Sequence, residues 1–305
     1  MANEYEVIII GGGPAGLSAG LYTSRARLRS LLIERGPLGG QITNAELVEN
    51  YPGFPQGISG LELGQLMHQQ ATRYGLETLQ AEATGLELQG EKRVVITTKG
   101  KFTARAVIIA SGSERRKLGI AGEEEFTGRG VSYCATCDGP FFKDRTIAVV
   151  GGGNAAITEA LHLVKFASRV KVIHRRNELR ATRILQEKAL AEPKIEFLWD
   201  TEVEGIEGKD KVKRLSLSNV ITREKSTLDV AGVFVAIGLK PNTDYLKGVL
   251  PIDKAGYIVT NERMETPVAG IFAAGDVRLN SARQAITAAG DGATAAVYAE
   301  KFLSK

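Results

Sequence analysis

Proline is scarce in this 305-residue chain, with nine residues, while glycine is plentiful, with 35. This balance excludes a collagen-like chain and a Pro/Gly-rich disordered one. No apolar run approaches the ~20 residues that a membrane span needs, and the longest, residues 230–239, contains glycine. The net charge of +4 is too small and too dispersed to indicate a nucleic-acid partner. What remains is a globular chain long enough for about two domains.

The N-terminus lacks the basic start of a signal peptide. It reads Met-Ala-Asn-Glu-Tyr-Glu, and the apolar residues 7–10 run directly into three glycines. We therefore expect a cytoplasmic protein. Cysteine is also scarce, with only Cys134 and Cys137 present. In a reducing compartment a static bridge between them is not expected, so the pair needs another explanation.

One pattern occurs twice in the chain. Residues 7–16 read Val-Ile-Ile-Ile-Gly-Gly-Gly-Pro-Ala-Gly, and residues 147–156 read Ile-Ala-Val-Val-Gly-Gly-Gly-Asn-Ala-Ala. Each copy continues with a helix-length segment and a second apolar strand, which ends at Glu34 in the first copy and at His174 in the second. The copies align without a gap. A strand, a glycine turn, a helix and a strand form a βαβ unit, so the repeat predicts an α/β protein with two Rossmann-like dinucleotide-binding domains.

The glycines of the first copy have the spacing that a bound pyrophosphate requires. Gly11 allows the tight turn, Gly13 lets the pyrophosphate approach the backbone, and Gly16 allows the helix to pack closely on the strand. The pyrophosphate then lies at a helix N-terminus. In the second copy Gly151 and Gly153 match, and an alanine replaces the third glycine. Two glycine-rich turns without a ligand are the alternative, which the two copies in register disfavour.

The ends of the second strands predict different ligands. Glu34 can accept hydrogen bonds from ribose hydroxyls and would repel a 2′-phosphate, which suits FAD or NAD. The second copy instead has His174, Arg175 and Arg176, followed by Arg180 and Arg183. Guanidinium groups at this point suit the 2′-phosphate of NADPH.

The spacing of these arginines also suggests a helix. If Asn177 caps the following helix, Arg176, Arg180 and Arg183 lie near one of its faces. A solvated basic helix end or a nucleic-acid patch is the alternative reading of the cluster.

Further elements follow from hydrophobic periodicity. We expect helices over residues 17–27, 60–74, 157–167 and 282–302, and a hairpin tip within residues 204–214. The expected strands are 85–89, 94–98, 107–110, 195–199, 203–206, 212–217, 233–237 and 271–274.

Cys134 and Cys137 form a CxxC motif, which serves metal binding or thiol–disulfide exchange. Structural zinc needs about four ligands, but there is no second CxxC and no histidine at ligand spacing. Redox exchange is favoured, because CxxC lowers the pKa of one thiol. Zinc shared across a dimer and a static buried pair are the alternatives.

Asp138 follows the CxxC directly and can protonate a departing thiolate or a reduced flavin. Its alternative reading is a turn residue before Gly139 and Pro140. A redox dithiol beside two dinucleotide sites suggests one electron path, from a nicotinamide through a flavin to the disulfide.

Motifs along the whole chain resemble the bacterial-type, low-molecular-weight thioredoxin reductases. These motifs are Gly11–Gly16, Gly39–Gln41, Val48–Gly53, Cys134–Asp138, Gly151–Asn154, His174–Arg176, Val235–Gly238 with Pro241 and Asn242, Ala274–Val277, and Arg283–Ala285. Of these, Cys-Ala-Thr-Cys-Asp ahead of the second glycine turn is the most specific.

The resemblance implies a discontinuous FAD domain, residues 1–115 and 244–305, with an NADPH domain, residues 116–243, inserted and carrying the CxxC. The implied FAD site comprises Gly11, Gly13, Pro14, Ala15, Gly16, Glu34, Gly39, Gly40, Gln41, Asn50, Gly275, Asp276, Arg283, Gln284 and Ala285. The implied NADPH site comprises Gly151, Gly153, Asn154, Ala155, His174, Arg175, Arg176 and Arg180.

The family further implies catalytic roles and partners. Cys137 would face the flavin, Cys134 would attack the disulfide of thioredoxin, and Asp138 would donate a proton. A homodimer is implied, with an NADPH domain that swings relative to the FAD domain. Ala155 departs from the family pattern, where a serine or threonine is common, and its loss of a hydroxyl contact would weaken NADPH binding modestly.

We therefore expect NADPH-dependent reduction of thioredoxin, with no metal, nucleic-acid or membrane partner. A dithiol oxidase that passes electrons to oxygen is the nearest alternative, but it has no need of the arginine cluster. A non-enzymatic dinucleotide- or zinc-binding module and a peroxiredoxin-reducing flavoprotein are more distant alternatives.

Overall fold

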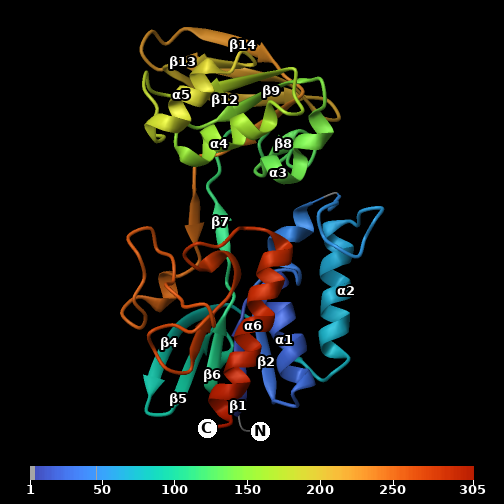
Figure 1. Ribbon diagram of the computed structural model, residues 1–305, viewed down its shortest axis with the longest axis vertical. Coiled ribbons are helices and arrows are strands. Elements are labelled where there is room, and N and C mark those ends of the chain that lie inside the picture. The colour runs from blue at the N-terminus through green and yellow to red at the C-terminus, as the bar shows by residue number, and fades with distance from the viewer. Residues whose placement is uncertain (1–3, 46) are drawn as a thin grey trace. The chain divides into compact units, whose positions relative to one another are not determined.

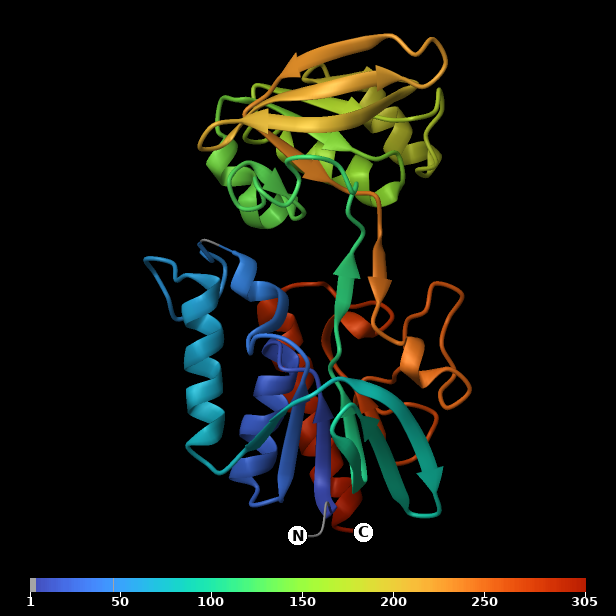
Figure 2. The same ribbon diagram turned by 180° about the vertical axis from the view of Figure 1, so that it is seen from behind.

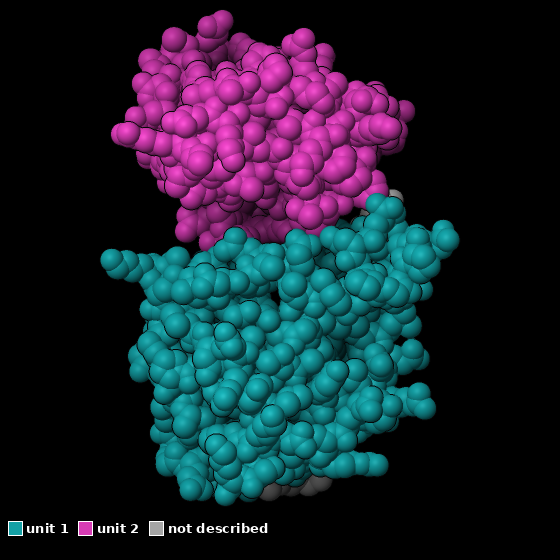
Figure 3. All heavy atoms as spheres, in the orientation of Figure 1, with its two compact units in different colours: residues 1–114, 240–305 teal, residues 115–239 magenta. Residues whose placement is uncertain are grey.

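The computed structural model describes residues 4–45 and 47–305. The first three residues of the N-terminal segment considered above therefore lie outside the described residues. The chain forms two compact units, one made of residues up to 114 and from 240 onward, the other of residues 115–239 (Figure 3). The predicted boundaries were 115/116 and 243/244. The assignment of one cofactor to each unit stays a prediction.

The first unit is built on a seven-stranded sheet (Figure 1). Its strands are β1 (Glu4–Ile10), β2 (Ser30–Glu34), β3 (Glu77–Gln80), β4 (Ala83–Gln89), β5 (Lys92–Thr97), β6 (Gly100–Ile109) and β17 (Ile271–Ala273). β3, β2, β1 and β6 are parallel in that order, β17 also pairs with β6 in parallel, and β5 and β4 add an antiparallel hairpin. Its helices are α1 (Pro14–Arg25), α2 (Gly60–Thr72) and α6 (Ala285–Leu303), with short 3-10 turns at Gly40–Asn44, Asp244–Leu246 and Gly275–Val277.

Alternation along β1 builds a core on both faces of this sheet. Val7 and Ile9 pack against the alanine-rich faces of α1 and α6, while Ile8 and Ile10 pack toward the β4–β5 hairpin. All four are at most 4% exposed. Figure 2 shows α1 and α6 together behind the sheet and β4 and β5 on the viewer's side. Both faces are covered, which is typical of a parallel sheet with continuous apolar strands.

The second unit has the same plan on a smaller scale. Its five-stranded parallel sheet has the order β11-β10-β9-β15-β8, and β12, β13 and β14 form an antiparallel sheet. The strands are β8 (Val131–Ser132), β9 (Thr146–Val150), β10 (Arg169–Ile173), β11 (Ile195–Leu198), β12 (Thr201–Gly208), β13 (Val212–Asn219), β14 (Lys225–Asp229) and β15 (Gly232–Val235). The helices are α3 (Ala135–Asp138), α4 (Asn154–Leu163) and α5 (Arg183–Ala191), with a 3-10 turn at Gly139–Phe142.

The chain passes between the units through two short strands that pair with each other, β7 (Ser113–Arg115) and β16 (Leu239–Pro241). No helix among the described residues is long and apolar enough to cross a membrane. The α/β class with two Rossmann-like domains is confirmed, as are the expected strands and the helix that begins at Gly60.

Three sequence expectations need correction. The C-terminal helix begins at Ala285 rather than at residue 282, because Arg283 has a left-handed backbone (φ 57°) and Gln284 is extended. The helices predicted over 17–27 and 157–167 begin three residues earlier, directly after their glycine turns. Most of the predicted hairpin tip is paired strand, because β12 and β13 remain paired up to Gly208 and Val212, with register shifts between Val203 and Gly205 and between Glu207 and Gly208.

Candidate functional site

The first glycine turn forms a cradle at the start of α1. Gly11 has a φ of +111°, which is strained for any residue with a side chain, and a Cβ there would overlap the carbonyl oxygen of Ala110. Gly13 is the N-cap of α1, Pro14 at its first position has no N–H group, and no side chain among the described residues caps the helix, so the N–H groups that follow Pro14 remain for a ligand. A Cβ on Gly13 would meet only the Gly39 carbonyl oxygen, at 3.8 Å. The turn therefore leaves room for a pyrophosphate at a helix N-terminus.

Glu34 fixes this turn from the end of β2. Its Oε2 accepts the Gly12 N–H at 2.5 Å, and its Oε1 accepts the Gly36 N–H at 2.7 Å. The N–H of Gly39 also donates to the Gly12 carbonyl oxygen at 2.8 Å. A carboxylate oxygen has two lone pairs, so Glu34 can hold the loop and still accept from a ribose hydroxyl.

Residues far apart in the sequence meet at this cradle. A Cβ on Gly40 would lie 3.0 Å from the Cα of Gly13, and one on Gly275 would lie 3.0 Å from the Cβ of Ala15. Both glycines have positive φ. The structure thus brings three predicted FAD segments, those of Gly13, Gly40 and Gly275, into one site.

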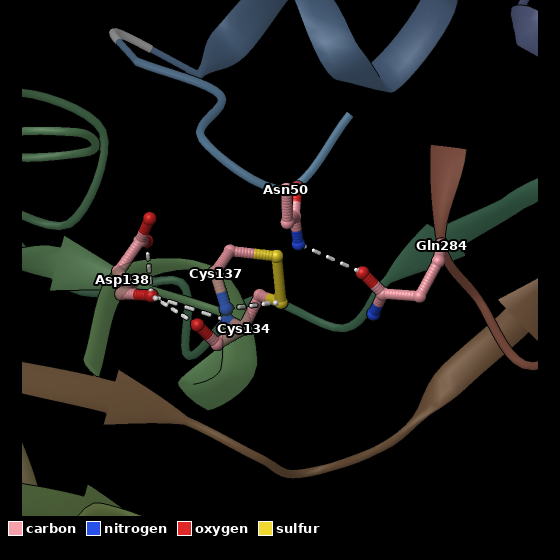
Figure 4. Close-up of a disulfide and its surroundings, with 6 residues drawn as sticks. Asn50, Cys134, Cys137, Asp138 and Gln284 are labelled. Atoms are coloured by element: carbon pink, nitrogen blue, oxygen red, sulfur yellow. Dashed lines mark hydrogen bonds between the residues drawn. A yellow bond between two sulfur atoms is a disulfide. The ribbon is translucent and has the colours of Figure 1, made fainter. Parts of the chain in front are cut away.

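The remaining predicted FAD residues belong to the same unit. Asn50 donates to the Oε1 of Gln284 at 3.2 Å, shown in Figure 4. Asp276 accepts from the hydroxyl of Ser281 at 3.1 Å, and Arg283 lies over the ring of Tyr257. Gln41, Pro14 and Ala285 lie in the Gly40–Asn44 turn and at the starts of α1 and α6.

A small cavity of about 90 Å³ adjoins the first cradle. It is lined by Gly11 and Glu34 together with residues that were not predicted to bind a cofactor, namely Arg35, Ala81, Glu82, Ala83, Ser111, Asn242 and Tyr245. Asn242 and Ser111 are tied by two hydrogen bonds, at 2.8 and 2.9 Å. Burial raises the pKa of Tyr245. Pro241-Asn242 was noted only as a family motif, and no periodicity could connect it with Ser111 across 131 residues.

The second glycine turn repeats the first. Gly151 has a φ of +147°, and a Cβ there would lie 2.6 Å from the Ala236 carbonyl oxygen. Gly153 is the N-cap of α4, and in the described part of the chain no side chain caps it and no atom lies within 4 Å of an added Cβ. Ala155 is exposed at this helix start, and Asn154 accepts the Thr182 N–H at 2.8 Å. Here too the helix start is open to an anion.

His174 occupies the place of Glu34 but is buried, with 5% of it exposed. Its ring covers Gly152, where a Cβ would overlap it, and its Nε2 lies 3.1 Å from the Glu178 carbonyl oxygen. Burial lowers the pKa of His174, and Arg180, Arg176 and Arg175 add to that effect. The neutral ring therefore supports the turn, while the arginines supply the charge.

The arginines lie on a loop, which corrects the predicted helix. α5 begins at Arg183 with Thr182 as its N-cap, so Asn177 caps no helix. The loop is held against the glycine turn instead, because the Arg180 N–H donates to the Gly152 carbonyl oxygen at 2.7 Å and Leu179 is buried. Arg175, Arg176 and Arg180 are all exposed.

The cysteines form a disulfide in the second unit, Cys134–Cys137 (Figure 4). Cys134 is the N-cap of the short helix α3, and its Sγ accepts the Cys137 N–H at 3.2 Å. Such a bond stabilises a thiolate at Cys134 when the pair is reduced. Among the described residues no group of three or more His, Cys, Asp or Glu side chains could hold a metal.

Asp138 lies beside the disulfide. Its Oδ2 accepts from the Ser132 hydroxyl at 2.5 Å. Burial raises the pKa of Asp138, while the Ser132 hydroxyl and the Arg115 guanidinium counteract the rise. A carboxyl group whose protonated form is favoured by burial is suited to donate a proton.

Glu159 on α4 is a titratable group that sequence reasoning missed. Its Oε2 is buried and has no hydrogen-bond partner among the described residues. Burial raises the pKa of Glu159 to about 7, with Arg115 opposing the rise. No sequence signal distinguishes it from the other glutamates on helices, because its burial depends on tertiary packing.

Comparison with known proteins identifies the class. The family model for pyridine nucleotide-disulphide oxidoreductases matches residues 5–292, so the chain belongs to this family of oxidoreductases. A thioredoxin reductase of Streptomyces coelicolor is 49% identical over 307 residues, covering 100% of this chain and 95% of the relative. One of Bacillus subtilis is 47% identical over 302 residues, covering 99% and 95%.

Solved structures agree with these relatives. The crystal structure of thioredoxin reductase from Streptococcus pyogenes has a TM-score of 0.96 and 42% identity, and covers 100% of this chain and 99% of that one. The sequence resemblance and the fold expected from it are thereby confirmed, and the Cys134–Cys137 bond agrees with a redox-active pair.

Proposed function

We propose that this protein is an NADPH-dependent flavoprotein that reduces the disulfide of thioredoxin through FAD and the Cys134–Cys137 pair. The observation that carries this proposal is the difference between two otherwise equivalent cradles. One is closed by the Glu34 carboxylate, and the other by residues 175–182, which we call the arginine loop. The bonded cysteine pair lies in the unit of the second cradle. The relatives named thioredoxin reductase support the choice of substrate.

The first cradle fits FAD. Open N–H groups at the start of α1 suit its pyrophosphate, and the Glu34 carboxylate suits the hydroxyls of its adenosine ribose. The adjoining cavity extends this surface to Arg35 and Tyr245. When held there, FAD would supply two-electron redox chemistry between a nicotinamide and the disulfide. We assign to FAD the fifteen residues named above, from Gly11 to Ala285.

The second cradle fits NADPH. Its pyrophosphate would lie at the start of α4, beside Gly151, Gly153, Asn154 and Ala155. The 2′-phosphate would be bound by Arg175, Arg176 and Arg180, because guanidinium groups form bidentate hydrogen bonds with phosphate. His174 holds the turn beneath them.

The dithiol would complete the reaction. The Cys134 thiolate attacks the thioredoxin disulfide, so that a mixed disulfide forms and one thioredoxin thiolate leaves. Cys137 then attacks the Cys134 sulfur, which restores the Cys134–Cys137 bond and releases the second thiolate. Two electrons pass from the dithiol to thioredoxin. Asp138 supplies a proton to a leaving thiolate.

We also propose a homodimer in the cytoplasm. Leu61 and Leu66 on α2 and Tyr22 on α1 are 51%, 41% and 47% exposed, which leaves apolar surface on the first unit for a second copy. A compartment that keeps thiols reduced suits an enzyme that uses NADPH to reduce disulfides.

A dithiol oxidase is the second candidate, and the arginine loop argues against it, since electron transfer to oxygen needs no 2′-phosphate site. An anaerobic titration of the purified protein decides between them. We expect a yellow protein whose flavin is bleached by NADPH at far lower concentration than by NADH, and which reduces thioredoxin. Bound flavin that neither nicotinamide reduces would overturn the proposal.

The cysteine pair can be tested separately. In Cys137→Ser we expect thioredoxin reduction to fall below detection, because no second thiol resolves the mixed disulfide. Reduction of the flavin by NADPH, followed at the visible absorption band, should persist and serves as the internal control. Loss of both steps would mean that the electron path is assigned wrongly.

A further inference from the structure

Ser132 connects the cysteine pair to the acid beside it. It ends β8, opposite Phe234 of β15, and is 4% exposed. Its hydroxyl oxygen lies 2.5 Å from Asp138 Oδ2, 3.1 Å from the Cys134 nitrogen and 3.5 Å from the Cys134 carbonyl oxygen. All three polar neighbours belong to residues 134–138, which we call the redox loop. Pairing of β8 with β15 uses only backbone groups, so it does not explain these side-chain hydrogen bonds.

The hydroxyl can satisfy both protonation states of Asp138. It has one donor hydrogen and two acceptor lone pairs. When Asp138 is ionised, Ser132 donates to the carboxylate and accepts the Cys134 N–H. When Asp138 is protonated, Ser132 accepts from both groups and turns its own hydrogen to the Cys134 carbonyl oxygen. The same heavy atoms serve both states, so no buried polar group is left without a partner.

We propose that Ser132 is a positioning residue for proton transfer at the cysteine pair: its hydroxyl turns between Asp138 and the Cys134 carbonyl as Asp138 loses and regains its proton. This inference rests on the proposed function. It predicts that the redox loop and the acid act as one hydrogen-bonded unit.

The proton balance of the thioredoxin step gives this rotation a use. Protonated Asp138 gives its proton to the first thiolate that leaves thioredoxin and becomes a carboxylate. The carboxylate then takes the thiol proton of Cys137, which becomes the thiolate that attacks the Cys134 sulfur. Asp138 ends protonated, the dithiol is oxidised by two electrons, and thioredoxin is reduced by two. Ser132 donates to Asp138 only during the interval in which the acid is charged.

The charged groups around Asp138 are the background against which Ser132 acts. Arg115 of β7 lowers the pKa of both Asp138 and Glu159, the nearby carboxyl group on α4. The same guanidinium lies over the ring of Tyr133, 5.6 Å from its centroid. These groups remain in a Ser132 variant, so a change in the pH profile reports on the hydroxyl alone.

The test is a single-turnover reaction of the prereduced enzyme with oxidised thioredoxin across pH. For Ser132→Ala we expect about a tenfold slower thiol release, since part of the general-acid contribution is lost. The alkaline limb of the pH–rate profile should move to higher pH by about one unit, because the variant lacks a hydrogen bond that favours the charged carboxylate of Asp138. Flavin reduction by NADPH should be unchanged. The control is Ser218→Ala, a buried serine of β13.

Two further variants separate positioning from a merely structural role. In an Asp138→Asn background, Ser132→Ala should cause no further loss, because both changes act on one step. Ser132→Thr keeps the hydroxyl and should recover the wild-type limb. An unshifted limb in Ser132→Ala, or additive losses with Asp138→Asn, would overturn the inference. A wild-type protein that NADPH cannot reduce would overturn the proposed function instead.

Discussion

The two βαβ copies share one construction but are closed in different ways. In each, the residue at the end of the second strand covers the middle glycine, and a backbone N–H from the next loop donates to that glycine's carbonyl oxygen. In the first copy the Glu34 side chain contacts this glycine, and its carboxylate accepts hydrogen bonds from two N–H groups. In the second copy the buried ring of His174 contacts it. The common geometry therefore suits a pyrophosphate in both copies, and under the proposed function the closing residues distinguish the two nucleotides.

The copies also differ in how tightly the helix meets the turn. A Cβ on Gly16 would overlap the Gly11 carbonyl oxygen, whereas Ala156 carries a real Cβ at the matching place. The backbone of the second turn differs from that of the first, because φ is +147° at Gly151 and +111° at Gly11. Equivalent sequence positions thus tolerate different residues because the turns are not identical.

The largest expected effect comes from exchanging these two residues. Gly16→Ala should abolish flavin retention, since the overlap is with backbone and cannot be relieved by a side-chain rotation. The reciprocal Ala156→Gly should cost only about 1–2 kcal/mol of stability, from helix propensity and a lost buried methyl group. FAD content after gel filtration and thermal melts measure both. Full retention of FAD by Gly16→Ala would show that the first turn is not as tight as this overlap indicates.

The next effect concerns the arginine loop. Arg175→Ala with Arg176→Ala should raise KM for NADPH about 10- to 100-fold and leave KM for NADH nearly unchanged, because only NADPH carries the 2′-phosphate. Arg169→Ala, an exposed arginine at the far end of β10, is the control. Similar changes for both nucleotides would contradict the 2′-phosphate assignment.

The smallest expected effect is on the pH dependence of stability, and it concerns Glu159 on α4. Glu159 on α4 matches Ala19 on α1, which is fully buried. The folded pKa of Glu159 is raised to about 7 from an ordinary value of 4.5. The stability that protonated Glu159 contributes is therefore fully present below pH 4.5 and is lost as the pH rises through about 7, because Glu159 ionises at a lower pH in the unfolded state.

Glu159→Gln removes this dependence. We expect the variant to be more stable than wild type at pH 8 by about 2 kcal/mol and to differ little at pH 4.5. Thermal melts by circular dichroism at both pH values measure it. A constant difference across this range would mean that Glu159 titrates normally in the folded protein.

Much of the fold could be predicted from the sequence. Apolar runs that end in glycines located β1 and β9, and periodicity located α2. The helix starts were placed too late, since the first turn of each helix after a glycine turn contains no large apolar residue to mark it. The arginine helix was predicted wrongly, because helical spacing ignores the tertiary bond from Arg180 to Gly152.

The sequence by itself determined the family, the two glycine turns, the disulfide partners and the different ends of the second strands, because each is a local pattern of residue types. Only the tertiary structure decided what surrounds them. It brought Gly275 against Ala15, paired Ser111 with Asn242 and buried the Glu159 carboxyl group. These features depend on chain segments that meet in space, and no spacing along the chain encodes such a meeting.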